Sequence, residues 1–439
     1  MCDLLLRKIQ TRSLFPPACQ SMNLKEKIVI TGLGVVSPIG IGLDAFWDSL
    51  INGRSGVCER PEFAGTNYPF KIGGVVKDFE GKAFVKPRKA LKVMCRPIQF
   101  GFAAATMAAQ QAGLAECGID PVRVGTVFGA ETFFAEPGEV SDVFHSCISD
   151  GIYDHDKWGE KFVREIRPLW MLKYLPNMVA SHISIALNAT GPSNTICQSD
   201  TSSSLAIIEG ATLIQRGLVD VAIVGGTGSP MSITGLLFHG HKHLSQQTQD
   251  PEAACRPFDG NRDGQVASEG AGAIVLESEA HAKARGAKIL CEVAGWKRSY
   301  CTRPKVSEFG DSIAANIQDS LDKAGISANE VGLASLNGNG EVESDAAEAA
   351  AIKKIFKNIS GFATKSNIGN IGPGSGAIEI ASAILSLQNS LAPPSINYDS
   401  NNAGSLGFLS NQKYSLDSPF ALKTSFSKTG QVASFILKC

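Results

Sequence analysis

The sequence predicts an α/β fold built from two similar halves. Short β-branched segments alternate with longer helix-like segments through the first half, the order expected of β-α-β units. After Gly286 a comparable alternation begins again, which indicates an internal duplication. We place the halves at residues 22–280 and 281–439. Because no Pro/Gly/Ser-rich linker separates them, we expect them to pack as one unit.

The first half opens with an apolar run at residues 28–31 that predicts a buried strand, followed by a glycine turn. This turn is not a dinucleotide fingerprint, because Ser37 stands where GxGxxG needs its third glycine. The remaining elements give a largely parallel sheet. They are a helix over 103–112, a strand over 124–127, a helix over 201–216 and a strand over 219–224.

The second half repeats this alternation and ends in a hairpin. Its predicted elements are a strand over 289–293, a helix over 313–324, a strand over 331–336, helices over 346–356 and 378–387, and the hairpin over 420–437.

The composition indicates a cytoplasmic globular protein. The chain has 439 residues, 44% hydrophobic and 19% charged, with a net charge of -1. These values favour neither nucleic acid nor an anionic membrane as a partner, and no apolar stretch reaches the roughly 18–20 residues needed to span a bilayer. The 11 cysteines lack CxxC pairs and are expected to be reduced, buried thiols. We expect residues 1–21 to form a disordered extension.

Several motifs occur in the order and spacing of one known family. They are Val29-Ile-Thr-Gly-Leu-Gly-Val-Val-Ser-Pro38, Leu175-Pro-Asn-Met178, Arg256-Pro-Phe-Asp-Gly-Asn-Arg-Asp-Gly264, Glu269-Gly-Ala-Gly272 and His281-Ala-Lys-Ala-Arg-Gly286. From Lys27 onward the chain therefore resembles the 3-oxoacyl-[acyl-carrier-protein] synthases, or ketosynthases, of the thiolase-like superfamily. The resemblance implies a five-layered αβαβα fold and a dimer that forms across a sheet edge.

That family uses a cysteine at a helix start to hold an acyl chain, assisted by two histidines. Counted without gaps from the Gly191-Pro-Ser193 motif, the nucleophile position of this chain is Asp200. The first histidine position is Asn337, and the second, in Lys365-Ser-Asn-Ile-Gly-Asn370, is Asn370. The resemblance thus implies that no catalytic residue is intact.

Near the nucleophile and histidine positions, three charged residues match the family pattern and one residue departs from it. Lys365, Asp345 and Glu348 are retained, and the resemblance implies that they support the site as a buried charge network. Lys428 replaces the phenylalanine that gates the site in the family. Because Asp200 and Lys428 both depart from the pattern and face one pocket, we predict that they form an ion pair that plugs it.

These replacements remove the chemistry of the family. A carboxylate is a poor acyl acceptor, because a mixed anhydride hydrolyses or reverts. Asparagine has no titratable proton near neutral pH and cannot act as a general acid or base. We predict neither a metal site nor a cofactor.

Three further features are given structural interpretations. Cys197 is interpreted as a buried thiol within a strand rather than a displaced nucleophile. The alternating His239, His241 and His243 are interpreted as a solvated loop rather than a metal site. The glycines of residues 372–376 are interpreted as a tight turn beside Asn370 rather than a phosphate cradle.

The predicted function is that of a catalytically inactive, chain-length-factor-type subunit. Its partners would be an active ketosynthase, in a heterodimer, and an acyl carrier protein, in fatty-acid, polyene or polyketide-like chain elongation. Aspartate departs from the glutamine that such factors often carry at this position. Two alternatives remain: an independent acyl-thioester enzyme, acting as a homodimer, that uses Asp200 as a base, and a scaffold that only binds carrier protein.

Overall fold

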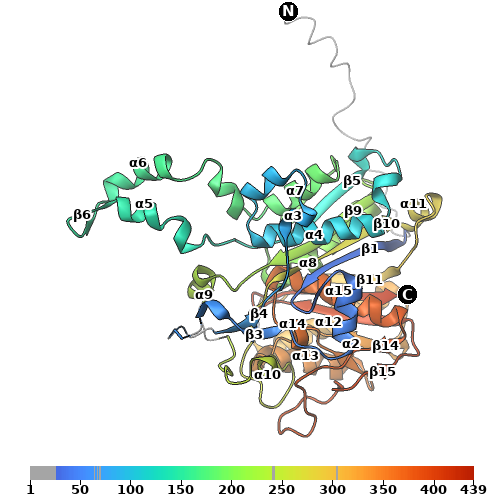
Figure 1. Ribbon diagram of the computed structural model, residues 1–439. Helices are drawn as coiled ribbons and strands as arrows, with labels where there is room; N and C mark the ends of the chain where they lie inside the picture. Colours follow the sequence, from blue (N-terminus) through green and yellow to red (C-terminus); the bar gives the residue numbers. More distant parts are fainter. Residues whose placement is uncertain (1–25, 64, 67, 69–70, 240–242, 303–304) are drawn as a thin grey trace, which may run out of the picture.

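The computed structural model describes residues 26–439 except 64, 67, 69–70, 240–242 and 303–304, so the predicted extension over residues 1–21 lies outside the described residues. One eleven-stranded sheet runs through the molecule in the order β13-β12-β16-β17-β11-β1-β10-β9-β5-β8, with β2 paired to β1 (Figure 1). Its strands are β1 (Ile28–Ser37), β2 (Gly40–Ile41), β5 (Val124–Gly129), β8 (Ser193–Ile196), β9 (Val221–Gly228), β10 (Gly270–Ser278), β11 (Cys291–Tyr300), β12 (Val331–Ser335), β13 (Gly361–Phe362), β16 (Phe420–Phe426) and β17 (Gln431–Lys438).

The strand order supports the prediction of two similar halves. Read outward from the β11–β1 junction, β17, β16, β12 and β13 follow on one side, and β10, β9, β5 and β8 follow on the other. The prediction of a largely parallel sheet is wrong. Only the outer pairs β12–β13, β12–β16, β5–β8 and β5–β9 are parallel, and the central pairs are antiparallel. The final hairpin β16–β17 is confirmed.

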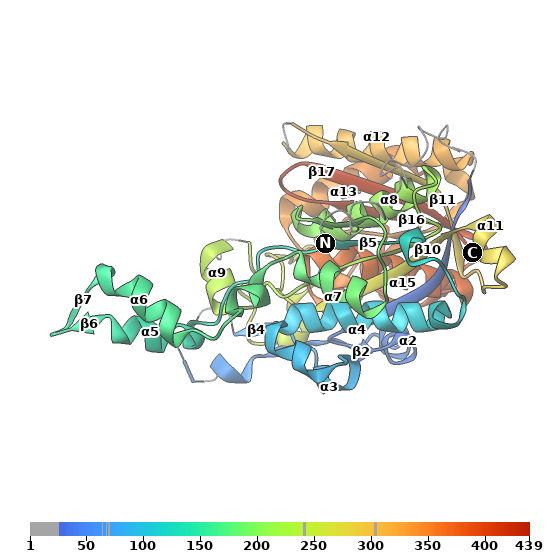
Figure 2. The ribbon, with the colours of Figure 1, turned by 90° about the horizontal axis from the view of Figure 1, so that it is seen from above.

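Helices form layers around and between the two sides of the sheet. The principal ones are α4 (Arg96–Gln111), α7 (Met178–Ala186), α8 (Ser202–Gln215), α12 (Val306–Ala324), α13 (Val342–Ile355) and α15 (Ser375–Gln388). Figure 2 shows α12 and α4 on opposite sides of the molecule, with the strands, α8 and α15 between them. Helix α8 packs on β5, β9 and β10, and α15 packs on β10, β12 and β16. The two central helices therefore lie between the halves.

The remaining elements are short, and one of them, α14, is fully buried. The helices are α2 (Leu43–Ile51), α3 (Gly81–Phe84), α5 (Ser141–Ser146), α6 (His155–Glu165), α9 (Ile233–His239), α10 (Pro251–Ala254), α11 (Glu279–Ala284) and α14 (Lys365–Ile368). The two-stranded sheets are β3 (Val57–Glu59) with β4 (Ile72–Gly74), β6 (Ile148–Ser149) with β7 (Ile152–Tyr153), and β14 (Leu391–Ala392) with β15 (Tyr414–Ser415).

The prediction of a glycine turn after residue 31 is wrong, because Gly32 and Gly34 lie within β1, which continues to Ser37. Both glycines have a packing role. A Cβ at Gly32 would lie 2.1 Å from the carbonyl oxygen of Ala108, and one at Gly34 would lie 2.0 Å from that of Ala104. Only glycine lets β1 approach α4 this closely. This close packing accounts for both glycines, so no nucleotide-binding role is needed to explain them.

An arm projects from the body between β5 and α7. It carries α5, the β6–β7 hairpin and α6, and it stands apart from the layered body in both views (Figures 1 and 2). Its apolar side chains include Phe144, Ile152 and Val163, which are 47%, 72% and 80% exposed. In the described part of the chain, no helix has the length and apolar character needed to cross a membrane.

Candidate functional site

A cavity of about 190 Å³ lies at the start of α8, where the two halves meet. Among its lining residues are Asp200, Asn370, Gln265, Glu131 and Lys428. The first two come from the predicted nucleophile and second histidine positions, although they are 170 residues apart in the chain. The fold thus brings them together as the resemblance implied.

Asp200 lies in a short 3₁₀ turn, Ser199–Thr201, that leads directly into α8. The hydroxyl of Ser202 accepts a hydrogen bond from the Gln198 amide and donates one to the Ser199 carbonyl, which fixes this turn. Burial raises the pKa of Asp200 above its ordinary value, while Lys365 and the hydrogen bond from Asn370 oppose the rise. The start of a helix also favours the charged carboxylate.

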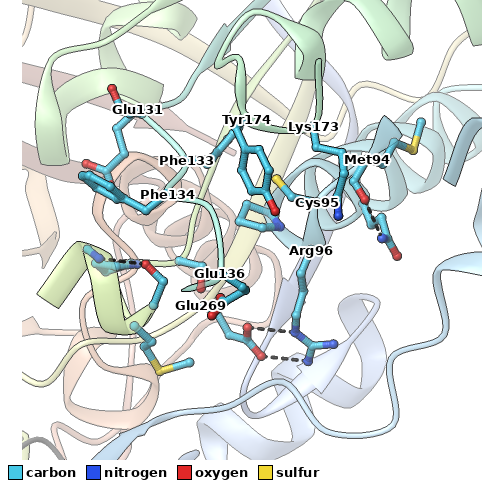
Figure 3. Close-up of a pocket in the computed structure, with 18 of the residues that line it drawn as sticks. Met94, Cys95, Arg96, Glu131, Phe133, Phe134, Glu136, Lys173, Tyr174 and Glu269 are labelled. Atoms are coloured by element: carbon cyan, nitrogen blue, oxygen red, sulfur yellow. Dashed lines mark hydrogen bonds and ion pairs between the residues drawn. The ribbon is translucent and has the colours of Figure 1, made fainter. Parts of the chain in front are cut away.

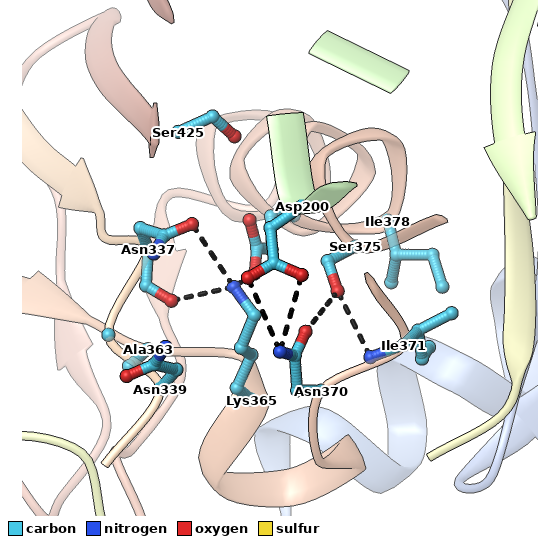
Figure 4. Close-up of polar contacts among 12 residues, drawn as sticks. Asp200, Asn337, Asn339, Ala363, Lys365, Asn370, Ile371, Ser375, Ile378 and Ser425 are labelled. Carbon is cyan, nitrogen blue, oxygen red and sulfur yellow. Dashed lines mark hydrogen bonds and ion pairs between the residues drawn. The ribbon is translucent and has the colours of Figure 1, made fainter. Parts of the chain in front are cut away.

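Asn370 uses its whole amide group inside the site (Figure 4). Its Nδ2 donates to Oδ1 and Oδ2 of Asp200 at 3.3 and 3.4 Å, and also to Oε1 of Gln265. Its Oδ1 accepts from the Gly372 amide at 3.0 Å and from the Ser375 hydroxyl at 3.2 Å. The side chain therefore acts as a fixed polar spacer, and it has no proton to exchange near neutral pH.

Lys365 lies in a buried charge network whose acid is Glu379. Its Nζ is 2.6 Å from Oε1 of Glu379, 2.7 Å from the Asn337 carbonyl oxygen and 3.3 Å from Asn337 Oδ1 (Figure 4). A second lysine, Lys423, approaches Oε2 of Glu379 at 2.8 Å. The side chains of both lysines and of Glu379 are 0% exposed. Burial alone would raise the pKa of Glu379, but the two lysines outweigh it and hold that pKa below its ordinary value.

Asp345 and Glu348, at the start of α13, hold the loop that carries Asn337. Glu348 accepts the backbone amides of Asn337 and Gly338 at 2.8 and 2.9 Å. Asp345 accepts those of Phe258, Asn339 and Gly340. Both carboxyl groups are fully buried, and burial raises both pKa values, that of Asp345 to about 7. Their contacts agree with the supporting role that the resemblance implied.

The predicted ion pair between Asp200 and Lys428 is wrong. Lys428 does line the same cavity, but its Nζ is 2.6 Å from Oε1 of Glu341 and 2.6 Å from Nδ1 of His243. No Asp200–Lys428 contact within 4.0 Å occurs between these described side chains. Lys428 lies in the exposed β16–β17 turn, where a nearer carboxylate, from the start of α13, neutralises it.

Glu131 faces Asp200 across Gly372. Its Oε1 and the Oδ1 of Asp200 lie 3.5 and 3.8 Å from the position that a Cβ on Gly372 would occupy. Burial, followed by the charge of Asp200, raises the pKa of Glu131 to about 8. The cavity therefore presents a protonated carboxyl group opposite a second carboxyl group at neutral pH.

Glu131 also borders a larger cavity of about 510 Å³. Charged side chains line this cavity in pairs. Arg96 Nη2 is 2.8 Å from Glu269 Oε1 (Figure 3), and Lys173 Nζ is 2.5 Å from Glu139 Oε1. Phe133, Phe134 and Tyr174 supply aromatic surface between these pairs. The space next to Asp200 is thus polar as well as aromatic.

The structure corrects or completes the three structural interpretations. Cys197 is exposed and follows β8 rather than lying within it. Of the three histidines, His241 lies outside the described residues, and His239 ends α9. The third, His243, is in an exposed turn, where its side chain contacts Lys428. The 372–376 segment is a turn, because Gly372–Gly374 forms a 3₁₀ helix that leads into α15.

The structure also shows which cysteines are buried and whether side chains are grouped as metal ligands. The nine described cysteines are free, but only Cys147, Cys255 and Cys291 are buried, so the prediction of buried thiols is wrong for most of them. Within the described ranges, no group of three or more His, Cys, Asp or Glu side chains is arranged to hold a metal ion.

Sequence reasoning missed five residues of this site. Four of them lack a local pattern that marks them, because each meets the site only through tertiary contacts. The missed residues are Glu131, Gln265, Glu341, Glu379 and Lys423. Glu379 offered one signal, since it lies on the apolar helix that follows Asn370 and a lone acid on such a helix needs a buried partner.

Comparisons with known proteins agree with this architecture. The family model of the beta-ketoacyl synthase N-terminal domain matches residues 25–282, and that of the C-terminal domain matches residues 290–399. The 3-oxoacyl-[acyl-carrier-protein] synthase 2 of Rhizobium meliloti (strain 1021) is 32% identical over 433 residues, 94% of this chain and 99% of that protein. The enzyme of the same name from Vibrio harveyi is 30% identical over 427 residues, with the same two coverages.

Solved structures show the same fold. A chain of the ishigamide ketosynthase/chain length factor is 26% identical with a TM-score of 0.81, covering 94% of this chain and 99% of that one. A chain from a type II polyketide acyl-carrier protein in complex with its ketosynthase is also 26% identical, with a TM-score of 0.78 and the same coverages. Together with the two family models, which match most of the sequence in order, these similarities establish that the chain belongs to the beta-ketoacyl synthase family.

Proposed function

We propose that this chain is a catalytically inactive ketosynthase-like subunit of the chain-length-factor type, which pairs with an active 3-oxoacyl-[acyl-carrier-protein] synthase. The observation that carries the proposal is the set of side chains around Lys365. A carboxyl group, Asp200, and two amides, Asn337 and Asn370, stand where the family pattern has a cysteine and two histidines. None of the three forms a stable thioester or transfers a proton as imidazole does.

The retained framework supports a binding role rather than decay of the whole site. Lys365, Asp345 and Glu348 remain buried and hydrogen-bonded although they no longer serve a nucleophile. A buried charge without a partner would destabilise the fold, so the intact network keeps the region around the cavity folded even without catalysis. A folded but unreactive scaffold next to cavities of about 190 and 510 Å³ suits a subunit that shapes the space for a growing chain.

Surface features support pairing with a second chain. Ile152 and Val163 on the arm are 72% and 80% exposed, and exposed apolar groups on a projecting element favour a protein partner. Strand β8 ends the sheet, so one of its edges is unpaired among the described residues. The solved relative named as a ketosynthase/chain length factor offers a precedent for such an assembly.

The first test is native mass spectrometry of the tagged chain isolated from its own host. We expect a one-to-one complex with a ketosynthase that retains its cysteine and both histidines. In the same preparation, incubation with acyl carrier protein loaded with a short acyl chain should add an acyl mass to the partner and none to this chain. A homodimer that acquires the acyl group itself would refute the proposal.

Reversion tests whether the cavity is a former acyl site. The variant with Asp200→Cys, Asn337→His, Asn370→His and Lys428→Phe should gain an acyl group on the new cysteine from acyl carrier protein, as measured by intact-protein and peptide mass spectrometry. The matched control carries the last three changes and keeps Asp200, and it should stay unmodified. If the variant with all four substitutions folds but is never acylated, the assignment of this cavity as a former acyl site is contradicted.

A second candidate function is an acyl-thioester hydrolase that uses Asp200 as a base. The observation that favours it is the facing pair of Asp200 and Glu131, both with raised pKa values, since perturbed carboxyl groups often mark active sites. It predicts turnover of acyl-carrier thioesters by the isolated chain that is lost in Asp200→Ala. Carrier protein binding without any turnover or change in product length would instead indicate a scaffold.

A further inference from the structure

Two cysteines face each other across the antiparallel pair of β11 and β17. The register of this pair runs as far as Glu292 opposite Lys438, so the next step along it sets Cys291 opposite Cys439. Figure 1 places the C end of the chain next to β11. Directly opposite residues of an antiparallel pair point to the same face of the sheet. The two thiols therefore lie side by side, although almost the whole second half of the chain separates them.

The backbone geometry at this step suits a disulfide. The amide of Cys439 donates to the carbonyl oxygen of Pro419 at 3.1 Å, so it points toward β16 and away from β11. Opposite residues that share no ladder hydrogen bond have Cα atoms about 4.5 Å apart, and disulfides join Cα atoms roughly 4.4–6.8 Å apart. The Cys291 thiol already reaches across the pair, because it donates to the Lys438 carbonyl oxygen at 3.3 Å.

The two thiols differ in how far solvent reaches them. Cys439 is exposed, whereas Cys291 is 1% exposed. Burial, followed by the interaction with the Cys439 thiol, raises the pKa of Cys291 well above its ordinary value. A dissolved oxidant therefore meets Cys439 first, and Cys291 is placed to react second, from inside the fold.

We propose that Cys439 is a site of thiol modification by a low-molecular-weight disulfide, and that Cys291 converts the adduct into a Cys291–Cys439 disulfide. In the first step, Cys439 gives its proton to water and its sulfur attacks one sulfur of glutathione disulfide, whose S–S bond breaks. In the second step, Cys291 gives its proton to water and attacks the Cys439 sulfur. Each step releases one glutathione thiolate, which takes up a proton. The two cysteines are oxidised, and one glutathione disulfide is reduced to two thiols.

The new bond joins the first and the last strand of the second half. Strand β11 opens this half in the sheet and β17 closes it, so the bond encloses residues 291–439 in one covalent loop. A cross-link over a long segment restricts the unfolded chain. Oxidation should therefore raise the urea midpoint of unfolding, and a thiol reductant should reverse the rise.

Oxidation of the full chain with glutathione disulfide tests the proposal. An N-terminal tag leaves Cys439 unchanged. Intact-protein mass spectrometry and peptide mapping without reductant should find a linked pair of peptides that contains Cys291 and Cys439 and lacks two hydrogens. Cys291→Ser should instead keep one glutathione on Cys439, and this adduct should be at least about tenfold more abundant than in the parent, because an adjacent thiol displaces glutathione efficiently.

Two controls separate this reaction from general thiol oxidation. Cys197 is also exposed, but it follows β8 at the opposite end of the sheet, so a glutathione adduct there should persist in the parent. Cys439→Ser changes an exposed residue and should fold. It should leave Cys291 reduced and abolish the rise of the urea midpoint.

A glutathione that persists on Cys439 in the folded parent would overturn the proposal. A Cys439 that stays reduced while Cys197 reacts would overturn it as well. The measurement needs no ketosynthase or carrier protein, so its result and that of the pairing experiment are independent.

Discussion

Glu379→Gln is expected to lower the free energy of unfolding by about 3–5 kcal/mol. The carboxylate of Glu379 is shared by Lys365 at 2.6 Å and Lys423 at 2.8 Å, and all three side chains are 0% exposed. Glutamine keeps the size of the side chain but leaves two ammonium groups facing each other in a buried space. Urea unfolding at pH 7, followed by circular dichroism, measures the change.

The control for this prediction is Asp311→Asn, which removes the acid from the exposed Lys354–Asp311 pair. It should change the free energy of unfolding by less than about 1 kcal/mol, because water already solvates both charges. Adding Lys423→Met to Glu379→Gln should recover part of the loss, since one of the two unpaired cations is removed. If Glu379→Gln is as mild as Asp311→Asn, the network does not contribute to stability as described.

Glu131→Gln is expected to remove a pH-dependent loss of stability worth on the order of a few kcal/mol. Burial, with the charge of Asp200, raises the pKa of Glu131 from 4.5 to about 8 in the folded chain. Between these values the folded state binds more protons than the unfolded state, so the free energy of unfolding falls as pH rises from about 4.5 to about 8. Glutamine stays neutral and removes this contribution.

Chemical unfolding at pH 5, 6.5 and 8 tests the sign. The variant should be close to the parent at pH 5 and increasingly more stable than the parent toward pH 8. Glu139→Gln serves as the comparison, because Glu139 borders the same cavity but its partners, Lys173, Trp170 and Tyr174, hold its pKa below the ordinary value. That variant should lose stability at pH 8, and a parallel response of the two variants would contradict the assignment of a protonated Glu131.

Most local structure and the family could be predicted from the sequence. Periodicity placed some elements within a few residues, because apolar alternation reflects local geometry. Helix α8 at 202–215 and the 420–437 hairpin are examples. Periodicity missed about two turns at the start of α4 and of α12 and the second half of β1 and of β11. The family resemblance also implied that Asp200 and Asn370 would meet, and they do so through direct hydrogen bonds.

Strand direction and solvent exposure could not be predicted in the same way. A strand has the same local pattern in parallel and antiparallel pairs, so the antiparallel centre of the sheet emerged only from the pairing of β1 with β10 and β11. Cys197 is exposed, because it follows β8 at the end of the sheet, a position that the local sequence pattern does not reveal.

The sequence by itself determined which side chains stand at the positions that the resemblance equates with the nucleophile and the two histidines, and the proposed inactivity rests on these side chains. Only the tertiary structure decided which charges neutralise one another. Lys428 pairs with Glu341 rather than Asp200, and Lys423 joins Lys365 on Glu379. The physical reason is that the attraction between charges depends on distance and burial, and both are set by contacts between residues far apart in the chain.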